Sequence, residues 1–345
     1  MKAKPADETY LFSNQDLKRL ILPLLVEQLL AITVGMADSI MVSSVGEAAV
    51  SGVSLVDTIF VLLINIFTAL ATGGAVVCGQ YLGKKRPEQA CQAADQLVLA
   101  TGILSILVMG LMYVLRTFIL NVVFGHIEPD VWNNCNIYFL IVSASIPFIS
   151  IYNAGAAIFR AQGDSKTPMK ISLLMNVINI IGNGILLYGF HFGVEGAAIP
   201  TLISRMFAAV VILARAYKTD HVLHLTRPVV WKLHWPTLKK ILRIGVPNGL
   251  ENSMFQLGKI LVLSLVTQFG TAAIAANAVS NTIAVFQTLP GMAMGNAILT
   301  VCAQCVGANQ YGQVRYYTKK LIKLIYAGLV FSCIAVILVL PLILN

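Results

Sequence analysis

Two acidic residues, Glu27 and Asp38, lie in one apolar stretch near the start of the chain. Their separation of 11 residues turns an α-helix through about 1100°, roughly 20° beyond three full turns, so both carboxylates share one face. The stretch 17–43 is long enough to cross a bilayer, where an ionisable side chain costs about 2.5–3.5 kcal/mol. Each acid therefore either hydrogen-bonds to a neighbouring helix or binds an ion or a proton. For Asp38 we favour the second interpretation, and for Glu27 both stay open.

A second group of polar side chains follows one face of the apolar segment 168–190 and continues on the next segment, 194–217. The group consists of Asn176, Asn179, Asn183, Thr201 and Arg205. Within each segment the spacing keeps these residues on one side of a helix, and a polar face at membrane depth must contact protein or water. Asparagines can simply join helices through hydrogen bonds. Beside Asp38, the same face would form a partly dehydrated site for a proton or a cation.

The composition excludes a soluble globular protein. Of the 345 residues, 57% are hydrophobic and 11% are charged, whereas soluble domains carry roughly a quarter charged residues. The net charge of +9 lies in short stretches between apolar segments, so we expect a lipid bilayer and not a nucleic acid as the partner. No phosphate-binding loop, metalloprotease motif or Cys–His metal spacing is complete, and we expect neither an enzyme nor a cofactor.

Nine apolar segments are long enough to cross a membrane as helices. They are 17–43, 50–82, 90–115, 133–159, 168–190, 194–217, 239–267, 272–306 and 315–344. Alternate connections hold 21 of the 24 Lys and Arg residues, and such residues mark the cytoplasmic side. We therefore expect a multi-pass protein of the inner or plasma membrane with a cytoplasmic N-terminus.

An internal repeat organises the chain, because residues 17–92 recur without a gap 224 positions later, at 241–316. Pro23 falls on Pro247 and Gly83 on Gly307. The offset spans six helices, an even number, so the two copies enter the membrane in parallel. The prediction is an all-α polytopic membrane protein with two parallel pseudo-symmetric lobes. The N-terminal lobe (1–217) has six helices, and the partial C-terminal lobe (239–345) has three of six. A cytoplasmic linker (218–238) joins them. This prediction treats the chain as C-terminally truncated.

The second copy carries its own polar residues in apolar segments. Glu251 repeats Glu27, and Asn281 repeats Asp57. Lys259 lies eight residues after Glu251, about 12 Å further along the helix. These residues, together with Glu27 and Gln256, are candidates for binding the substrate or the coupling ion. For Lys259, an ion pair between helices is the structural alternative.

Six motifs along the chain point to a known family. They are Pro23–Gln28, Ala37–Val42, Gly79–Gly83, Phe159–Pro168, Gly193–Ala198 and Gly245–Glu251. The chain resembles the multidrug and toxic compound extrusion (MATE) transporters, and most of all their bacterial DinF-type branch. The superfamily around them includes polysaccharide and lipid flippases. The resemblance covers essentially the whole chain and is present in both copies of the repeat.

The resemblance implies two six-helix lobes around a central cleft and roles for particular residues. Asp38 matches the acid of the proton- or cation-coupling site in the N-terminal lobe, with Asn179, Asn183 and Thr201 beside it. Relatives often have Asp where Asn183 stands. In another branch an acid follows the proline of the seventh helix by about two turns, where this chain has Gln256.

These observations predict a secondary active antiporter that exports small organic compounds in exchange for H⁺ or Na⁺ by alternating access. The membrane acids Glu27, Asp38 and Glu251 outnumber clearly buried cations, which favours cationic or neutral substrates. Two alternatives stay open: a flippase for lipid-linked saccharides with the same fold, and a truncated fragment that does not transport. We expect the full-length protein to be a monomer.

Overall fold

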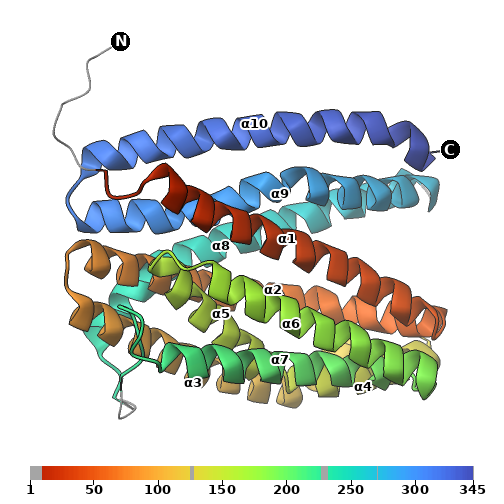
Figure 1. Cartoon of the computed structure of the whole chain (residues 1–345). Coiled ribbons are helices and arrows are strands. Elements are labelled where there is room, and N and C mark those ends of the chain that lie inside the picture. Colours follow the sequence, from red (N-terminus) through yellow and green to blue (C-terminus); the bar gives the residue numbers. More distant parts are fainter. Residues whose placement is uncertain (1–9, 125–127, 227–231, 270, 345) are drawn as a thin grey trace.

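The computed structural model describes residues 10–124, 128–226, 232–269 and 271–344, and this part of the chain is helical without a β-strand (Figure 1). The α-helices are α1 (Asn14–Ser43), α2 (Glu47–Gly83), α3 (Pro87–Phe118), α4 (Pro129–Ser143), α5 (Ile146–Ala161), α6 (Lys166–Asn183), α7 (Glu195–Ala216), α8 (Trp235–Val266), α9 (Thr271–Gly307) and α10 (Tyr311–Leu344). Two π-helical turns, η1 (Ile119–Val123) and η2 (Gly184–Gly189), extend α3 and α6, and the 3₁₀ turn η3 (Thr267–Phe269) follows α8.

The predicted segment 133–159 is the one that the structure divides in two. It consists of α4 and α5, whose axes differ in direction by 46° across a break of two residues. Pro147 lies in the first turn of α5, where a missing backbone N–H costs little. The other predicted segments each correspond to one α-helix, with the end of 168–190 wound as η2. All-α architecture is therefore confirmed.

Within the described residues, seven helices are long and apolar enough to cross a membrane, or eight if α4 and α5 form one span. The protein is thus a multi-pass membrane protein. α8 is a helix as predicted but does not belong to this set. Its middle is interrupted by polar side chains, among them Glu251, Gln256 and Lys259.

The two copies of the repeat meet where α2 crosses α9, and the crossing is reciprocal. A Cβ atom added to Gly83 would overlap the backbone carbonyl oxygen of Gln304, and one added to Gly307 would overlap that of Gln80. Both pairs are related by the 224-residue offset found in the sequence. Because glycine has no Cβ, it alone lets the two helix backbones approach this closely.

The arrangement of the two copies is reciprocal here too, because the first helix of each copy packs on the second helix of the other. α8 packs on α2, where a Cβ on Gly245 would lie 3.0 Å from the carbonyl oxygen of Ala69. α1 packs correspondingly on α9, and its buried residues Leu17 and Ile21 share a core cluster with Ala297. α1 also contacts α6, so it connects the other helices of the N-terminal part, α2–α7, to the second copy (Figure 1).

The linker between the copies is held against α3 through Gln96, a buried side chain whose two polar atoms are both used. Its Nε2 donates to the carbonyl of Lys232 at 2.9 Å, and its Oε1 accepts from the backbone N–H of His234 at 2.7 Å. The linker therefore packs as part of the fold at this point. The division into lobes at 1–217 and 239–345 stays a prediction.

Replacing Gln96 with Leu should loosen this linker. The change keeps the side-chain volume but leaves a backbone carbonyl and a backbone N–H without partners, which costs about 1–3 kcal/mol. We expect faster cleavage between α7 and α8 by a protease acting on the detergent-purified chain. Gln92→Leu, at an exposed position one turn earlier on α3, is the matched control. Equal cleavage rates of the two variants would contradict the contribution of Gln96.

Candidate functional site

Asp38 lies in a polar cluster built by α1, α6 and α7. The Nδ2 atom of Asn183 donates a hydrogen bond to Asp38 Oδ1 at 2.7 Å. In the amide orientation that satisfies both neighbours of Asn179, its Nδ2 lies 2.8 Å from Asp38 Oδ1 and its oxygen accepts from Thr201 Oγ1 at 3.1 Å. We call these four residues the Asp38 cluster. Two amides and one hydroxyl thus hold a carboxylate inside the helix bundle.

The local sequence explains how α6 presents this face. Asn176, Asn179 and Asn183 recur at helical spacing and are all buried, with Asn183 only 1% exposed. Their apolar neighbours Val177, Ile180 and Ile181 are exposed on the other side of the helix, as lipid-facing residues would be. The Oδ1 atom of Asn183 is buried and has no hydrogen-bond partner within the part of the chain that the structure describes. Beside Asp38 there is therefore an additional acceptor that a cation or a proton donor can use.

Arg205 and Asp57 complete the electrostatics of this region. Arg205 of α7 is near enough to attract both Asp38 and Asp57, and the two carboxylates repel each other. Its Nη1 donates to Ser145 Oγ at 2.7 Å, while the hydroxyl of Tyr138 donates to Asp57 Oδ1 at 3.2 Å. With both acids ionised, two negative charges face one positive charge. In that ionisation state the region has one negative charge in excess.

Asp57 and Tyr138 are not among the site residues predicted from the sequence. Asp57 carried a usable signal, because it is an acid within the apolar segment 50–82. Tyr138 carried none, since a tyrosine in an apolar helix is common and its partner lies 81 residues away. The sequence predicts Arg205 as part of the polar face beside Asp38, but it does not predict Asp57 as the second acidic partner of Arg205.

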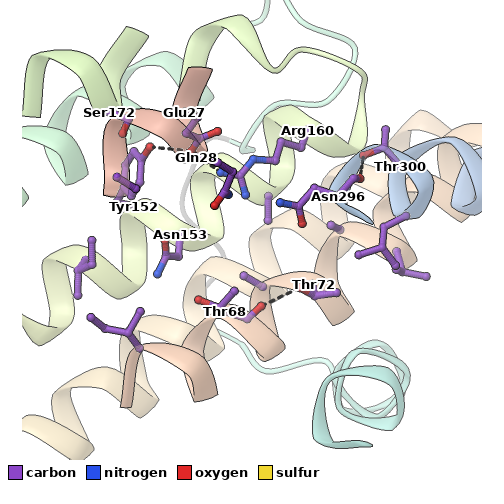
Figure 2. A pocket seen from close by; sticks show the side chains of 18 of the residues that line it. Glu27, Gln28, Thr68, Thr72, Tyr152, Asn153, Arg160, Ser172, Asn296 and Thr300 are labelled. Carbon is purple, nitrogen blue, oxygen red and sulfur yellow. Dashed lines mark hydrogen bonds and ion pairs between the residues drawn. The ribbon is translucent and has the colours of Figure 1, made fainter. Parts of the chain in front are cut away.

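Glu27 lies in a different place and has a different partner. Its Oε1 forms an ion pair with Nη2 of Arg160 at 2.6 Å, and the hydroxyl of Tyr152 lies 3.5 Å from the same oxygen. Arg160 lies in the last turn of α5. Its place just after the apolar segment 133–159 predicts a cation of a connecting loop. The pair lines a cavity of about 360 Å³ among α1, α2, α5, α6 and α9, which we call the Glu27 pocket (Figure 2).

A larger cavity of about 740 Å³ lies between α2, α8 and α9. Gln256, Lys259 and Asn281 line it, together with Thr58 and apolar residues of α2 and α8. Glu251 is exposed and does not line it. Lys259 Nζ lies 5.1 Å from the ring centroid of Phe255, and within the described residues it forms no ion pair. The ion pair between helices that the sequence left open for Lys259 is therefore not formed in this part of the chain.

Comparison with known proteins identifies the family. The MatE family model matches residues 23–185 and 247–345, which is most of the chain and includes both copies of the repeat. The chain belongs to the MatE family. In this MatE protein the Asp38 cluster and the Glu27 pocket both lie within the first matched segment, apart from Thr201 of α7 and the α9 residues of the pocket.

Individual relatives agree with this membership. The uncharacterized transporter YisQ of Bacillus subtilis (strain 168) is 27% identical over 316 residues, which cover 89% of this chain and 67% of the relative. The probable multidrug resistance protein YoeA of the same strain is 29% identical over 276 residues, or 78% of this chain and 59% of the relative. The MatE chain thus spans between 59% and 67% of the length of these two relatives.

A solved structure shares the fold of this MatE protein. It is described as the outward-facing conformation of a multidrug resistance MATE family transporter of the MOP superfamily. The TM-score is 0.86 at 22% sequence identity, with 93% of this chain and 71% of that chain covered.

The nine predicted site residues of the MatE chain fall into separate groups. Asp38, Asn179, Asn183 and Thr201 are brought together in the Asp38 cluster, whereas Glu27 lines the Glu27 pocket. Gln256, Lys259 and Asn281 line the cavity between α2, α8 and α9, and Glu251 lines neither cavity. The functional roles of all nine stay predictions.

Proposed function

We propose that this MatE protein is a secondary transporter that exports small organic compounds in exchange for H⁺ or Na⁺, and that it prefers cationic compounds. The observation that supports this most is the Asp38 cluster, an acid held by Asn179 and Asn183 inside membrane-spanning helices with one negative charge in excess nearby. Family membership and the name of the relative YoeA are consistent with export.

The position of α1 suggests how ion binding is transmitted. Asp38 lies in its second half, against α6, and the buried residues Leu17, Leu20 and Ile21 in its first half pack with α9 and α10. Neutralising Asp38 weakens the charge-assisted hydrogen bond from Asn183. A change in how α1 packs on α6 would then alter its contact with the second copy, as alternating access requires.

The proposed orientation places the N-terminus in the cytoplasm of a cell whose plasma membrane holds the protein. One hollow is lined by Tyr10 and Leu11, by the basic turn Lys84–Arg86 and by residues 307–310, so these ends of α1, α2 and α9 lie together. Basic residues gathered at one end mark the cytoplasmic side. We expect the transporter to work as a monomer in the bilayer, without a cofactor or a nucleic acid.

Lys259 favours a second candidate function. Among the residues lining the cavity between α2, α8 and α9 it carries the one formal charge, and apolar residues such as Leu62 and Val262 surround it. A lysine on an apolar wall suits an anionic amphiphile. A lipid-linked saccharide carries an anionic phosphate, so a flippase is the alternative that this cavity supports.

Transport by the full chain in proteoliposomes tests the proposal. Rhodamine 6G (a cation) and carboxyfluorescein (an anion) are compared under an imposed pH gradient and, separately, an imposed Na⁺ gradient. We expect one gradient to drive movement of the cation well above that of the anion, because the Asp38 region is negative. Faster movement of the anion would favour the flippase alternative. No gradient-driven movement of either dye would contradict the proposed antiport.

A further inference from the structure

The Glu27 pocket is enclosed by both copies of the repeat. α1, α2, α5 and α6 form most of its wall, and α9 of the second copy contributes Asn296, Leu299 and Thr300. Figure 2 shows Glu27 and Arg160 facing Thr68 and Thr72 across the pocket, with Asn296 on its α9 side. The volume of about 360 Å³ is within the range of small-molecule sites. A guest here would contact both copies at once.

The pocket is charge-balanced, and its ion pair is incompletely satisfied. Of the lining residues, Glu27 and Arg160 alone carry formal charges, and each has one. A guanidinium has five N–H donors, yet in the described part of the chain a single bond, from Nη2 to Glu27, uses them. Oε2 of Glu27 is buried and has no hydrogen-bond partner among the described residues. One oxygen of the acid therefore lacks a donor, and most N–H groups of the base lack acceptors.

Neutral polar groups surround the pair. The carboxamides of Gln28, Asn153 and Asn296 line the pocket, and none of the three makes a side-chain hydrogen bond to its neighbours among the described residues. Each amide offers both a donor and an acceptor. The rest of the wall carries apolar side chains, Ile64, Val76, Ile149, Met175 and Leu299 among them, together with the hydroxyls of Thr68, Thr72, Ser172 and Thr300. The pocket thus combines a polar, charge-balanced end with space for an apolar group.

We propose that the Glu27 pocket binds a small zwitterion that carries an ammonium and a carboxylate a few bonds apart and an apolar side group, as a free aromatic amino acid does. The ammonium contacts the carboxylate of Glu27, and the carboxylate of the guest accepts from the free N–H groups of Arg160. Such a guest keeps the pocket neutral. A guest with one charge leaves an uncompensated charge at membrane depth, which is costly.

This inference deepens the proposed function, since it names a class of cargo and a place for it away from Asp38. Binding itself needs neither an ion gradient nor turnover. It can therefore be measured even if the chain does not transport, and the two proposals can fail separately.

The test is calorimetric titration of the full chain in lipid nanodiscs with three probes of matched shape. They are L-phenylalanine (a zwitterion), phenethylamine (the cation) and 3-phenylpropionate (the anion). We expect phenylalanine to bind at least about tenfold more tightly than either analogue, a difference in Kd equivalent to about 1.4 kcal/mol. Tighter binding of an analogue would overturn the proposal. So would the absence of phenylalanine binding up to about 10 mM, ten times a weak millimolar Kd.

Two variants locate the binding. Glu27→Gln with Arg160→Gln removes both charges together, so that no unpaired charge stays buried. We expect the preference for phenylalanine over its analogues to fall to about threefold or less, roughly half the difference in free energy. Asn296→Ala on α9 removes a neutral contact without touching the pair and should weaken phenylalanine binding severalfold. An unchanged preference in the double variant would place the binding elsewhere.

Ser39→Ala is the matched control on α1. Ser39 is exposed, its hydroxyl bonds to the backbone carbonyl of Gly35, and it is not among the residues that line the Glu27 pocket. Phenylalanine should bind to this variant as it binds to the unmodified chain, whether or not the chain transports. Loss of binding in Ser39→Ala would show that binding does not depend on the Glu27 pocket, which would overturn the assignment.

Discussion

Asp38→Asn should reduce gradient-driven transport in proteoliposomes to the level of protein-free liposomes. The substitution keeps the size and shape of the side chain, and Asn183 Nδ2 can still donate to its oxygen, as it does to Asp38 at 2.7 Å. What it removes is the charge that binds a cation and the carboxylate that takes up a proton. The variant should still insert and fold, because an amide at membrane depth costs less than an acid.

A matched control lies on the next residue of α1. Ser39 is exposed, and its hydroxyl bonds to the backbone of its own helix at Gly35, so Ser39→Ala should transport normally. The exchange Asp38→Asn with Asn183→Asp moves the carboxylate across the same hydrogen bond. We expect it to recover part of the transport that the single variant loses. Full transport by Asp38→Asn alone would exclude Asp38 as the coupling residue.

Helical periodicity was enough to predict the polar face of α6, and the family resemblance implied that Asp38 lies beside it. A period of 3.6 residues places Asn176, Asn179 and Asn183 on one face of α6 whatever the tertiary fold. A polar face in an apolar segment can only turn inward, toward another polar group of the bundle. Asp38 is one of few such groups. Local geometry and the polarity of the surroundings therefore restrict the possible partners before any packing is known.

The partners of Glu27 and Asp57 could not be predicted in the same way. Glu27 pairs with Arg160, which lies 133 residues away, and Asp57 accepts from Tyr138, which lies 81 residues away. Which helix lies beside which depends on the packing of the whole chain. A shift of α5 by one turn along its axis would give Glu27 another neighbour. Arg160 also stands at a helix end, where a cation is usually solvated. Only the folded chain shows that it turns inward.

The internal repeat, by contrast, predicted a long-range relationship without naming a contact. Two parallel copies must meet about an axis that exchanges them, so each contact between them occurs twice with the roles reversed. The pairs Gly83–Gln304 and Gly307–Gln80 are such a reciprocal contact. The sequence offset thus indicates which residues correspond, and the structure adds that these are the ones at which the copies touch.

Replacing either glycine where α2 crosses α9 should destabilise the fold strongly. In Gly83→Ala the new Cβ would overlap a backbone carbonyl of α9, and in Gly307→Ala one of α2. A backbone carbonyl in a helix cannot rotate away as a side chain can, so the helices must separate. Overpacking of this kind costs about 1–3 kcal/mol per site. We expect a lower thermal midpoint for each single variant in detergent.

The reciprocal geometry makes the double variant informative. One separation of α2 from α9 relieves both overlaps, so the second alanine should cost less than the first, and the two effects should not add. Gly291→Ala is the control within α9, because no atom lies within 4 Å of its added Cβ. There the better helix propensity of alanine, worth about 1 kcal/mol, should leave the midpoint equal or higher. Strictly additive losses would mean that the two glycines act at independent contacts. A drop of the same size in the thermal midpoint of Gly291→Ala would mean that the crossing of α2 and α9 does not cause the destabilisation.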